Sequence, residues 1–183
     1  MRKTIKYFPL LFLLIFATGC TNSGYGSMEE AIQNSGIQYK QIYYQYEVKK
    51  GVILFYVNPN GGIDAGLVYK NGKKFKWGFG SGTVSYPTDE EVTWGAANLD
   101  INAKTEEQKN YWIYYGIIKQ ADITKLHIEH KGTIKSINKD ANIVELSDGF
   151  RLWFALQDEQ NSIQPGFILD GYNKDGVNVY HFE

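Results

Sequence analysis

Short segments rich in aromatic and β-branched residues dominate the chain, and this rhythm constrains its fold more than any other feature. Such residues favour strands, in which alternate side chains point to opposite faces. Residues 39–48 alternate in this way, whereas residues 52–57 are apolar throughout, which predicts a half-buried strand beside a strand covered on both faces. We expect further strands over residues 63–70, 74–79, 92–94, 111–118, 125–131, 133–138, 143–147, 150–156, 166–172 and 177–182.

Residues that favour turns separate these segments. Gly, Asn and Asp adopt the backbone conformations of tight turns more easily than other residues do. We therefore predict turns at residues 50–51, 58–62, 71–72, 139–142, 148–149 and 173–176. The run of alternating apolar residues at 150, 152, 154 and 156 predicts a core stripe that belongs to the second half of the chain.

One helix is expected near the start of the folded region. Ser27 and Glu30 have the spacing of a capping box, and Gly36 can end the helix. Met28, Ala31 and Ile32 would share its apolar face, which must pack on a larger element because the helix is short. Residues 105–109 could add a single helical turn.

Together these patterns predict a mainly β protein with one short N-terminal helix. An antiparallel sandwich, a partly open barrel and two packed β-lobes all fit the regular spacing of short strands. We divide the chain into 1–19, a signal peptide; 20–27, a lipidated tether; 28–118, a helix and β-lobe; and 119–183, a second β-lobe that could form one domain with the first.

The N-terminus carries an export pattern. Arg2, Lys3 and Lys6 precede an apolar run over residues 7–17, which is too short to cross a membrane and which ends in small residues. The run is therefore expected to be a cleaved signal. The only cysteine of the chain, Cys20, follows it directly. The alternative is a secreted protein that is cut elsewhere and keeps a spare thiol.

The sequence Ala17-Thr18-Gly19-Cys20 resembles the lipobox of bacterial lipoproteins. Together with the helix expected at 27–36, YEVKKGVILFY at 46–56 and RLWFAL at 151–156, it makes most of the chain resemble small lipoproteins of low-GC Gram-positive bacteria. The resemblance implies that Cys20 receives a diacylglyceryl group and becomes the first residue of the mature protein. Two acyl chains hold a protein firmly on a membrane. The expected location is the outer, extracytoplasmic face of the cell membrane, and the resemblance implies no activity.

Charge argues against one class of partner. The whole chain has a formal charge of −1, and without the three signal-peptide cations it has 16 basic and 20 acidic residues. An acidic mature chain disfavours nucleic-acid binding through a basic field. No disulfide is expected in the folded part, because Cys20 is the only cysteine.

Several patterns resemble sites of chemistry, but each has a simpler interpretation. His127, Glu129 and His130 are suitable metal ligands, yet in a strand the third points away from the other two, so we expect an exposed polar face, even if His181 joined them. The glycine-rich residues 78–82 lack the Lys-Ser/Thr ending of a phosphate loop, and Ser81 lacks the first glycine of a nucleophile elbow. We interpret this stretch as a turn or bulge.

The acidic and amide residues also lack a specific pattern. Asn138, Asp140, Asn142 and Glu145 alternate as in a calcium loop, but the glycine and the spacing of an EF-hand are missing, so we predict a hairpin turn. Asp89, Glu90 and Glu91 have the default interpretation of solvated loop charges. We therefore predict no metal, no cofactor and no catalytic residue.

The surplus of aromatic residues is the remaining functional signal. Tyr39 and Tyr43 are expected to share the polar face of their strand with Gln41 and Gln45. Rings and amides together can receive a sugar ring or a partner protein. The sequence thus favours a membrane-anchored, non-catalytic module that binds an envelope protein or glycan. The alternatives are an envelope hydrolase that uses acids such as Asp89, Glu90 or Glu145, and a ligand carrier of lipocalin type.

Overall fold

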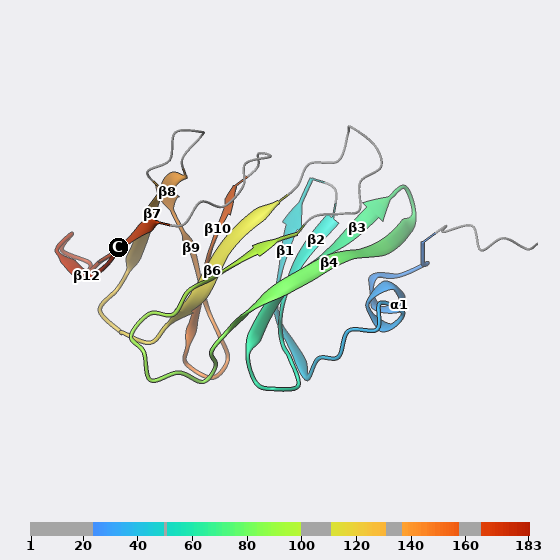
Figure 1. Ribbon diagram of the computed structural model, residues 1–183, viewed down its shortest axis with the longest axis horizontal. Coiled ribbons are helices and arrows are strands. Elements are labelled where there is room, and N and C mark those ends of the chain that lie inside the picture. Colours follow the sequence, from blue (N-terminus) through green and yellow to red (C-terminus); the bar gives the residue numbers. More distant parts are fainter. Residues whose placement is uncertain (1–23, 50, 100–110, 131–136, 158–165) are drawn as a thin grey trace, which may run out of the picture.

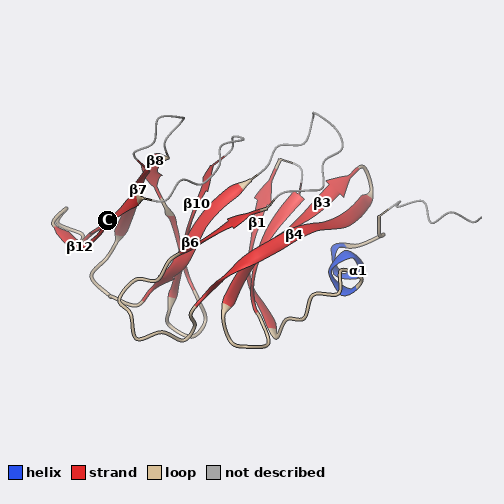
Figure 2. Cartoon of the chain, viewed as in Figure 1, coloured by secondary structure: helices blue, strands red, loops and turns tan. Residues whose placement is uncertain are grey.

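The computed structural model describes residues 24–49, 51–99, 111–130, 137–157 and 166–183, and within them the chain forms one helix and twelve strands. The predicted signal segment, Cys20, the helical turn at 105–109 and most of the strand predicted at 133–138 lie outside these residues. Figure 2 shows how completely strands dominate the rest. The chain is mainly β with one short helix, as predicted.

The strands form three antiparallel sheets. Sheet A contains, in spatial order, β1 (Gln41–Val48), β2 (Gly51–Val57), β3 (Ile63–Asn71) and β4 (Lys74–Val84). Sheet B contains β5 (Gly95–Asn98), β6 (Trp112–Ile118), β10 (Arg151–Gln157) and β9 (Asn142–Glu145). Sheet C contains β12 (Asn178–Phe182), β11 (Phe167–Tyr172), β7 (Lys125–His130) and β8 (Asn138–Asp140).

The sheets stack face to face, with sheet B in the middle (Figure 1). Side chains of sheets A and B share one core, which includes Ile53, Phe55, Leu67, Ile113, Tyr115, Leu152 and Phe154. Side chains of sheets B and C share a second core, which includes Tyr114, Trp153, Leu126, Ile128, Phe167 and Leu169. Open sheets packed in this way correspond to the sandwich among the predicted architectures.

Helix α1 (Met28–Gln33) covers the outer face of sheet A. The hydroxyl oxygen of Ser27 accepts the backbone N–H of Glu30 at 3.1 Å, so the predicted N-terminal cap is present. Ala31 and Ile32 are buried against Leu54 and Val68 of sheet A. The helix thus packs on a larger element, as expected, and its contact with Leu54 explains why residues 52–57 are apolar throughout.

Sheet B is buried on both faces, which explains the apolar sequences of β6 and β10. In β10, the stripe of Leu152, Phe154 and Leu156 packs against sheet A, while Trp153 and Ala155 pack against sheet C. The stripe predicted for the second half thus contributes to a core shared with the first half. Sheet B combines two strands from before residue 119, β5 and β6, with two from after it, β10 and β9, and residues 119–123 lead from it to sheet C.

The prediction of a hairpin turn at residues 139–142 is wrong. Asp140 still pairs with His127 in sheet C, and Asn142 already pairs with Phe154 in sheet B, so that only Ala141 separates the two strands. The chain crosses between sheets here instead of turning back. An Asn- and Asp-rich stretch has the composition of a turn in either case, which is why composition alone misled.

Other turns and irregularities follow the sequence more closely. Residues 148–149 and 173–176 form turns, and the turn between β3 and β4 is one residue later than predicted, with Gly72 at φ +61° and Asn71 paired with Lys74. The glycine-rich residues 78–82 form a bulged part of β4, which confirms the bulge interpretation. In place of a strand at 92–94, Val92 makes an isolated bridge to Ile118, and β5 begins at Gly95.

Candidate functional site

The four residues that the sequence grouped on one strand face are separated by a β-bulge. Ile42 pairs with Tyr56 and Tyr44 pairs with Phe55, so Tyr43 is an extra residue in β1. The simple alternation predicted for this strand is therefore wrong. The pairing places Gln41 opposite Val57 and Gln45 opposite Leu54, on opposite faces of sheet A, and both amides are exposed.

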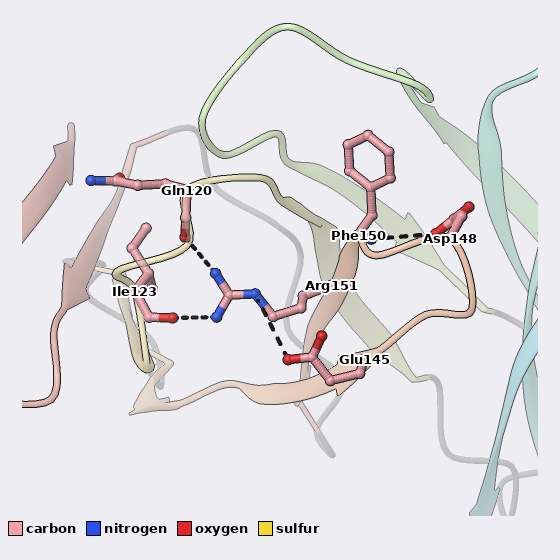
Figure 3. Close-up of polar contacts among 6 residues, drawn as sticks. All are labelled: Gln120, Ile123, Glu145, Asp148, Phe150 and Arg151. Carbon is pink, nitrogen blue, oxygen red and sulfur yellow. Dashed lines mark hydrogen bonds and ion pairs between the residues drawn. The ribbon is translucent and has the colours of Figure 1, made fainter.

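Tyr43 lies on the side of sheet A that faces sheet B. Its hydroxyl donates to the Asp148 carboxylate at 2.9 Å and lies 3.1 Å from the Tyr86 hydroxyl. Burial raises the pKa of Tyr43, and the hydrogen bond to Asp148 raises it further. Asp148 also accepts the backbone N–H of Phe150 at 3.3 Å, as Figure 3 shows. Tyr43 therefore joins the two sheets at the β9–β10 turn.

Tyr39 lies on the other side, where it belongs to an aromatic cluster. Its ring meets the Tyr56 ring edge to face, with the centroids 6.4 Å apart, and Tyr56 meets Trp77 in the same way at 6.2 Å. Tyr56 is buried, Trp77 is half-buried and Tyr39 is 38% exposed. We call Tyr39, Tyr56 and Trp77 the aromatic platform.

The indole ring of Trp77 rests directly on the backbone of β3. A Cβ atom on Gly66 would lie 2.3 Å from this ring, so no larger residue fits at that position without moving it. Gly80 provides the same clearance from β4, because its Cβ atom would lie 3.0 Å from the ring. Two glycines thus allow one flat aromatic surface to lie along the sheet.

A carboxylate stands beside the platform. Asp64 pairs across the strands with Tyr56, and its Oδ1 accepts the Asn58 amide at 2.9 Å and the Thr83 hydroxyl at 2.8 Å. Its second oxygen has no hydrogen-bond partner among the described residues. Burial, and then the charge of Asp64, raise the pKa of Tyr56 to about 12, so its hydroxyl is neutral at ordinary pH.

This arrangement combines an aromatic face with a fixed hydrogen-bond acceptor. Sugar rings present C–H groups that pack on aromatic faces and hydroxyls that donate to carboxylates. From the sequence, Tyr39 was predicted as a binding residue, whereas Asp64, Trp77 and Asn58 were not. One sequence signal points to Asp64: it is the only charged residue among apolar and glycine neighbours in residues 63–67.

The three residues that resemble a metal site, His127, Glu129 and His130, lie in β7 and alternate between its two faces, as expected for a strand. His127 is on the outer face of sheet C, His130 is buried, and Glu129 is half-buried. Among the described residues, no group of three or more potential ligand side chains comes together. His127 belongs instead to a row across the sheet, which we call the His–Asp row and which contains His181, Asp170, His127 and Asp140.

The acids of the hydrolase alternative lie on separate segments. Asp89 forms an exposed ion pair with Lys119 at 3.5 Å, and Glu145 lies 4.0 Å from the guanidinium of Arg151. That guanidinium also donates to the carbonyl oxygens of Gln120 and Ile123, so it connects sheet B to the segment that leads to sheet C (Figure 3). Glu145 thus belongs to a structural contact.

None of the helices formed by the described residues is long and apolar enough to span a bilayer. Comparison with models of protein families, with curated proteins and with solved structures finds no significant match to this chain.

Proposed function

We propose that the protein is a lipoprotein, anchored through Cys20 to the outer face of the cell membrane, that binds an envelope glycan without catalysing a reaction. The anchoring is supported by the export pattern and by the position of the only cysteine directly after it. A diacylglyceryl group on Cys20 would supply the two acyl chains that firm attachment requires.

One observation supports the choice of a glycan above others. Asn58 and Thr83 hold Asp64 in a fixed position, and its free oxygen stands next to an aromatic platform whose outermost ring is exposed. The ligand class that uses both features is a sugar ring, stacked on Tyr39 or Trp77 and donating a hydroxyl to Asp64. The negative charge of Asp64 favours neutral sugars over acidic ones.

Calorimetric titration with neutral N-acetylglucosamine oligomers and with acidic hexuronate oligomers tests this proposal. We expect binding of the neutral oligomers only. Asp64→Asn should weaken it by about 10- to 100-fold, because a hydrogen bond to a charged group is lost, and Tyr39→Ala by about tenfold, because a stacking contact is lost.

Two matched variants serve as controls. Tyr25 is 37% exposed, much like Tyr39, but it bridges to Phe75 near the start of β4, whereas Asp64 pairs with Thr83 near its end, so Tyr25→Ala should leave sugar affinity unchanged. Asp122→Asn removes an exposed carboxylate in the segment that connects sheet B to sheet C, and it should also leave sugar affinity unchanged. Equal losses in test and control variants, or no binding of either sugar, would count against the platform.

The anchor has its own test. The mass of the mature protein should show a diacylglyceryl group on Cys20, and Cys20→Ser should release the protein from the membrane fraction. A membrane-bound Cys20→Ser variant would contradict anchoring at this residue.

A further inference from the structure

Four exposed lysines lie together at the end of sheet A that carries the β1–β2 and β3–β4 turns. We call this group the lysine edge: Lys49, Lys70, Lys73 and Lys74. The antiparallel order places the β1–β2 and β3–β4 turns at the same end of the sheet. The register shows this directly, because Val48 pairs with Gly51, Gly51 pairs with Tyr69, and Asn71 pairs with Lys74. Four positive charges are thus gathered on a protein whose mature chain is acidic overall.

These lysines differ from those at the other end of the molecule. On the far side, Lys119 pairs with Asp89 at 3.5 Å and Lys125 pairs with Asp140 at 3.2 Å. Glu29 and Glu47 line a groove of about 750 Å³ together with Lys49 and Lys70, yet within the described ranges no ion pair joins these acids to the lysine edge. The four lysines therefore outnumber the two acids of this groove, and the excess positive charge is available to an external anion.

The start of the described chain lies beside this edge. Tyr25 forms two backbone hydrogen bonds with Phe75, at 2.7 and 2.9 Å, and a Cβ atom on Gly24 would lie 3.2 Å from that of Lys74. Only three residues lie between Cys20 and Gly24, so their Cα atoms are four steps apart, and four extended steps span at most about 14 Å. A lipid on Cys20 therefore keeps the membrane surface within reach of the lysine edge, and Figure 1 shows sheet C at the opposite end of the stack.

We infer that the lysine edge docks on anionic lipid headgroups of the membrane that carries the anchor. The inference rests on the proposed anchoring at Cys20 but not on sugar binding. Basic residues close to an anionic membrane surface strengthen attachment, and a basic patch beside a lipid anchor acts as a second attachment signal. The rest of the protein is acidic, so an anionic membrane repels it. This repulsion favours the orientation in which the lysine edge faces the membrane.

The first experiment uses the mature chain, residues 20–183, with Cys20→Ser, so that no lipid contributes to binding. Its sedimentation with phosphatidylcholine vesicles is compared with that on vesicles that also contain phosphatidylglycerol. We expect binding to the anionic vesicles only, at about 0.01 M salt, and its loss at about 1 M salt, because the Debye length falls from about 30 to about 3 Å.

Matched variants then locate the surface. Replacing all four lysines of the lysine edge with glutamine should lower partition at least about a hundredfold, since each lysine near the membrane is worth about a fivefold change. The control replaces Lys40, Lys119, Lys125 and Lys174 with glutamine, which changes the net charge equally at sites away from that edge. Equal loss in both variants, or no binding to anionic vesicles at low salt, would overturn the inference.

A second measurement uses the lipidated protein in the same vesicles. Amide exchange at residues 70–74 should slow in anionic vesicles relative to zwitterionic ones, and the variant of the lysine edge should lose this difference. The two proposals fail separately. A mature protein without lipid on Cys20 contradicts the anchor, whereas a lipidated protein whose exchange ignores lipid charge contradicts docking by the lysine edge.

Discussion

The two interfaces of the stack are both apolar cores, but different polar groups cross them. Between sheets A and B, the polar contacts come from tyrosine hydroxyls: Tyr115 donates to the carbonyl oxygen of Gly82 and lies 3.3 Å from that of Ile63, and Tyr43 donates to Asp148. Between sheet B and sheet C with its connections, they come from cations: Arg151 donates to Gln120 and Ile123, and Lys139 donates to the Leu156 carbonyl at 2.7 Å.

This difference predicts how each interface responds to solution conditions. Burial raises the pKa of Tyr115 and of Tyr43, so these hydroxyls stay neutral donors over the whole ordinary pH range. Sheet C, in contrast, presents ion pairs and the His–Asp row to solvent. Between pH 5 and pH 9 the A–B interface should therefore be less sensitive to pH and salt than the sheet C side.

The largest effect is expected from Phe55→Ala at the A–B interface. Phe55 is fully buried, and its ring centroid lies 5.1 Å from that of Phe154 and 5.7 Å from that of Tyr115. Truncation should lower the free energy of unfolding by about 3 to 5 kcal/mol, measured by chemical denaturation. The loss should be the same from pH 5 to pH 9, since no charge takes part; Phe79→Ala, at an exposed ring, is the control with a small expected effect.

A smaller loss of stability, with local effects confined to the sheet C side of the stack, is expected from Arg151→Met. The side chain is 12% exposed, and its loss leaves two carbonyl oxygens without their charged donor. We expect destabilisation of about 2 to 3 kcal/mol, which Arg151→Lys would restore only in part because lysine lacks the planar fork. Amide exchange should speed up in β7 and β11 more than in sheet A. Uniform acceleration through all three sheets would contradict the distinction between the interfaces.

The sequence was informative about elements whose pattern depends on local physics. The N-terminal cap at Ser27, the apolar β2 and the turns at Gly149 and Gly176 follow from residue chemistry over a few positions, and the structure has all of them. The middle layer could not be predicted, because a strand covered on both faces has the same composition whichever sheets cover it.

The candidate site shows the limit most clearly. One inserted residue, Tyr43, changes the face of every side chain before it relative to those after it, and no periodicity within residues 39–48 marks the bulge. Asp64 is likewise recognisable only once Asn58, Thr83 and Trp77, from different strands and loops, are brought around it. Long-range pairing, which decides both points, leaves no trace in the spacing of nearby residues.

The smallest effect, and the sharpest test of the pH contrast, concerns the carboxylates of the His–Asp row. A hydrogen bond from His127 lowers the pKa of Asp140; for Asp170, burial acts to raise the pKa, but hydrogen bonds from His181 and Asn178 outweigh it and the net direction is down. A pKa that is lower in the folded state contributes stability above the ordinary carboxyl value, and this contribution disappears as the pH falls through the folded-state pKa.

Asp170→Asn and Asp140→Asn should therefore destabilise the protein at pH 7, and the effect should shrink as the pH falls below the ordinary carboxyl value and the wild-type carboxylates become protonated. The expected loss is below about 1 kcal/mol for Asp140, which is largely exposed, and somewhat greater for the less exposed Asp170. Denaturation curves between pH 2.5 and 7 measure it, with Asp122→Asn as the unpaired control. If Phe55→Ala showed the same pH profile as Asp170→Asn, the ionic character of the His–Asp row could not be the cause, because Phe55 lies in the other core and carries no charge.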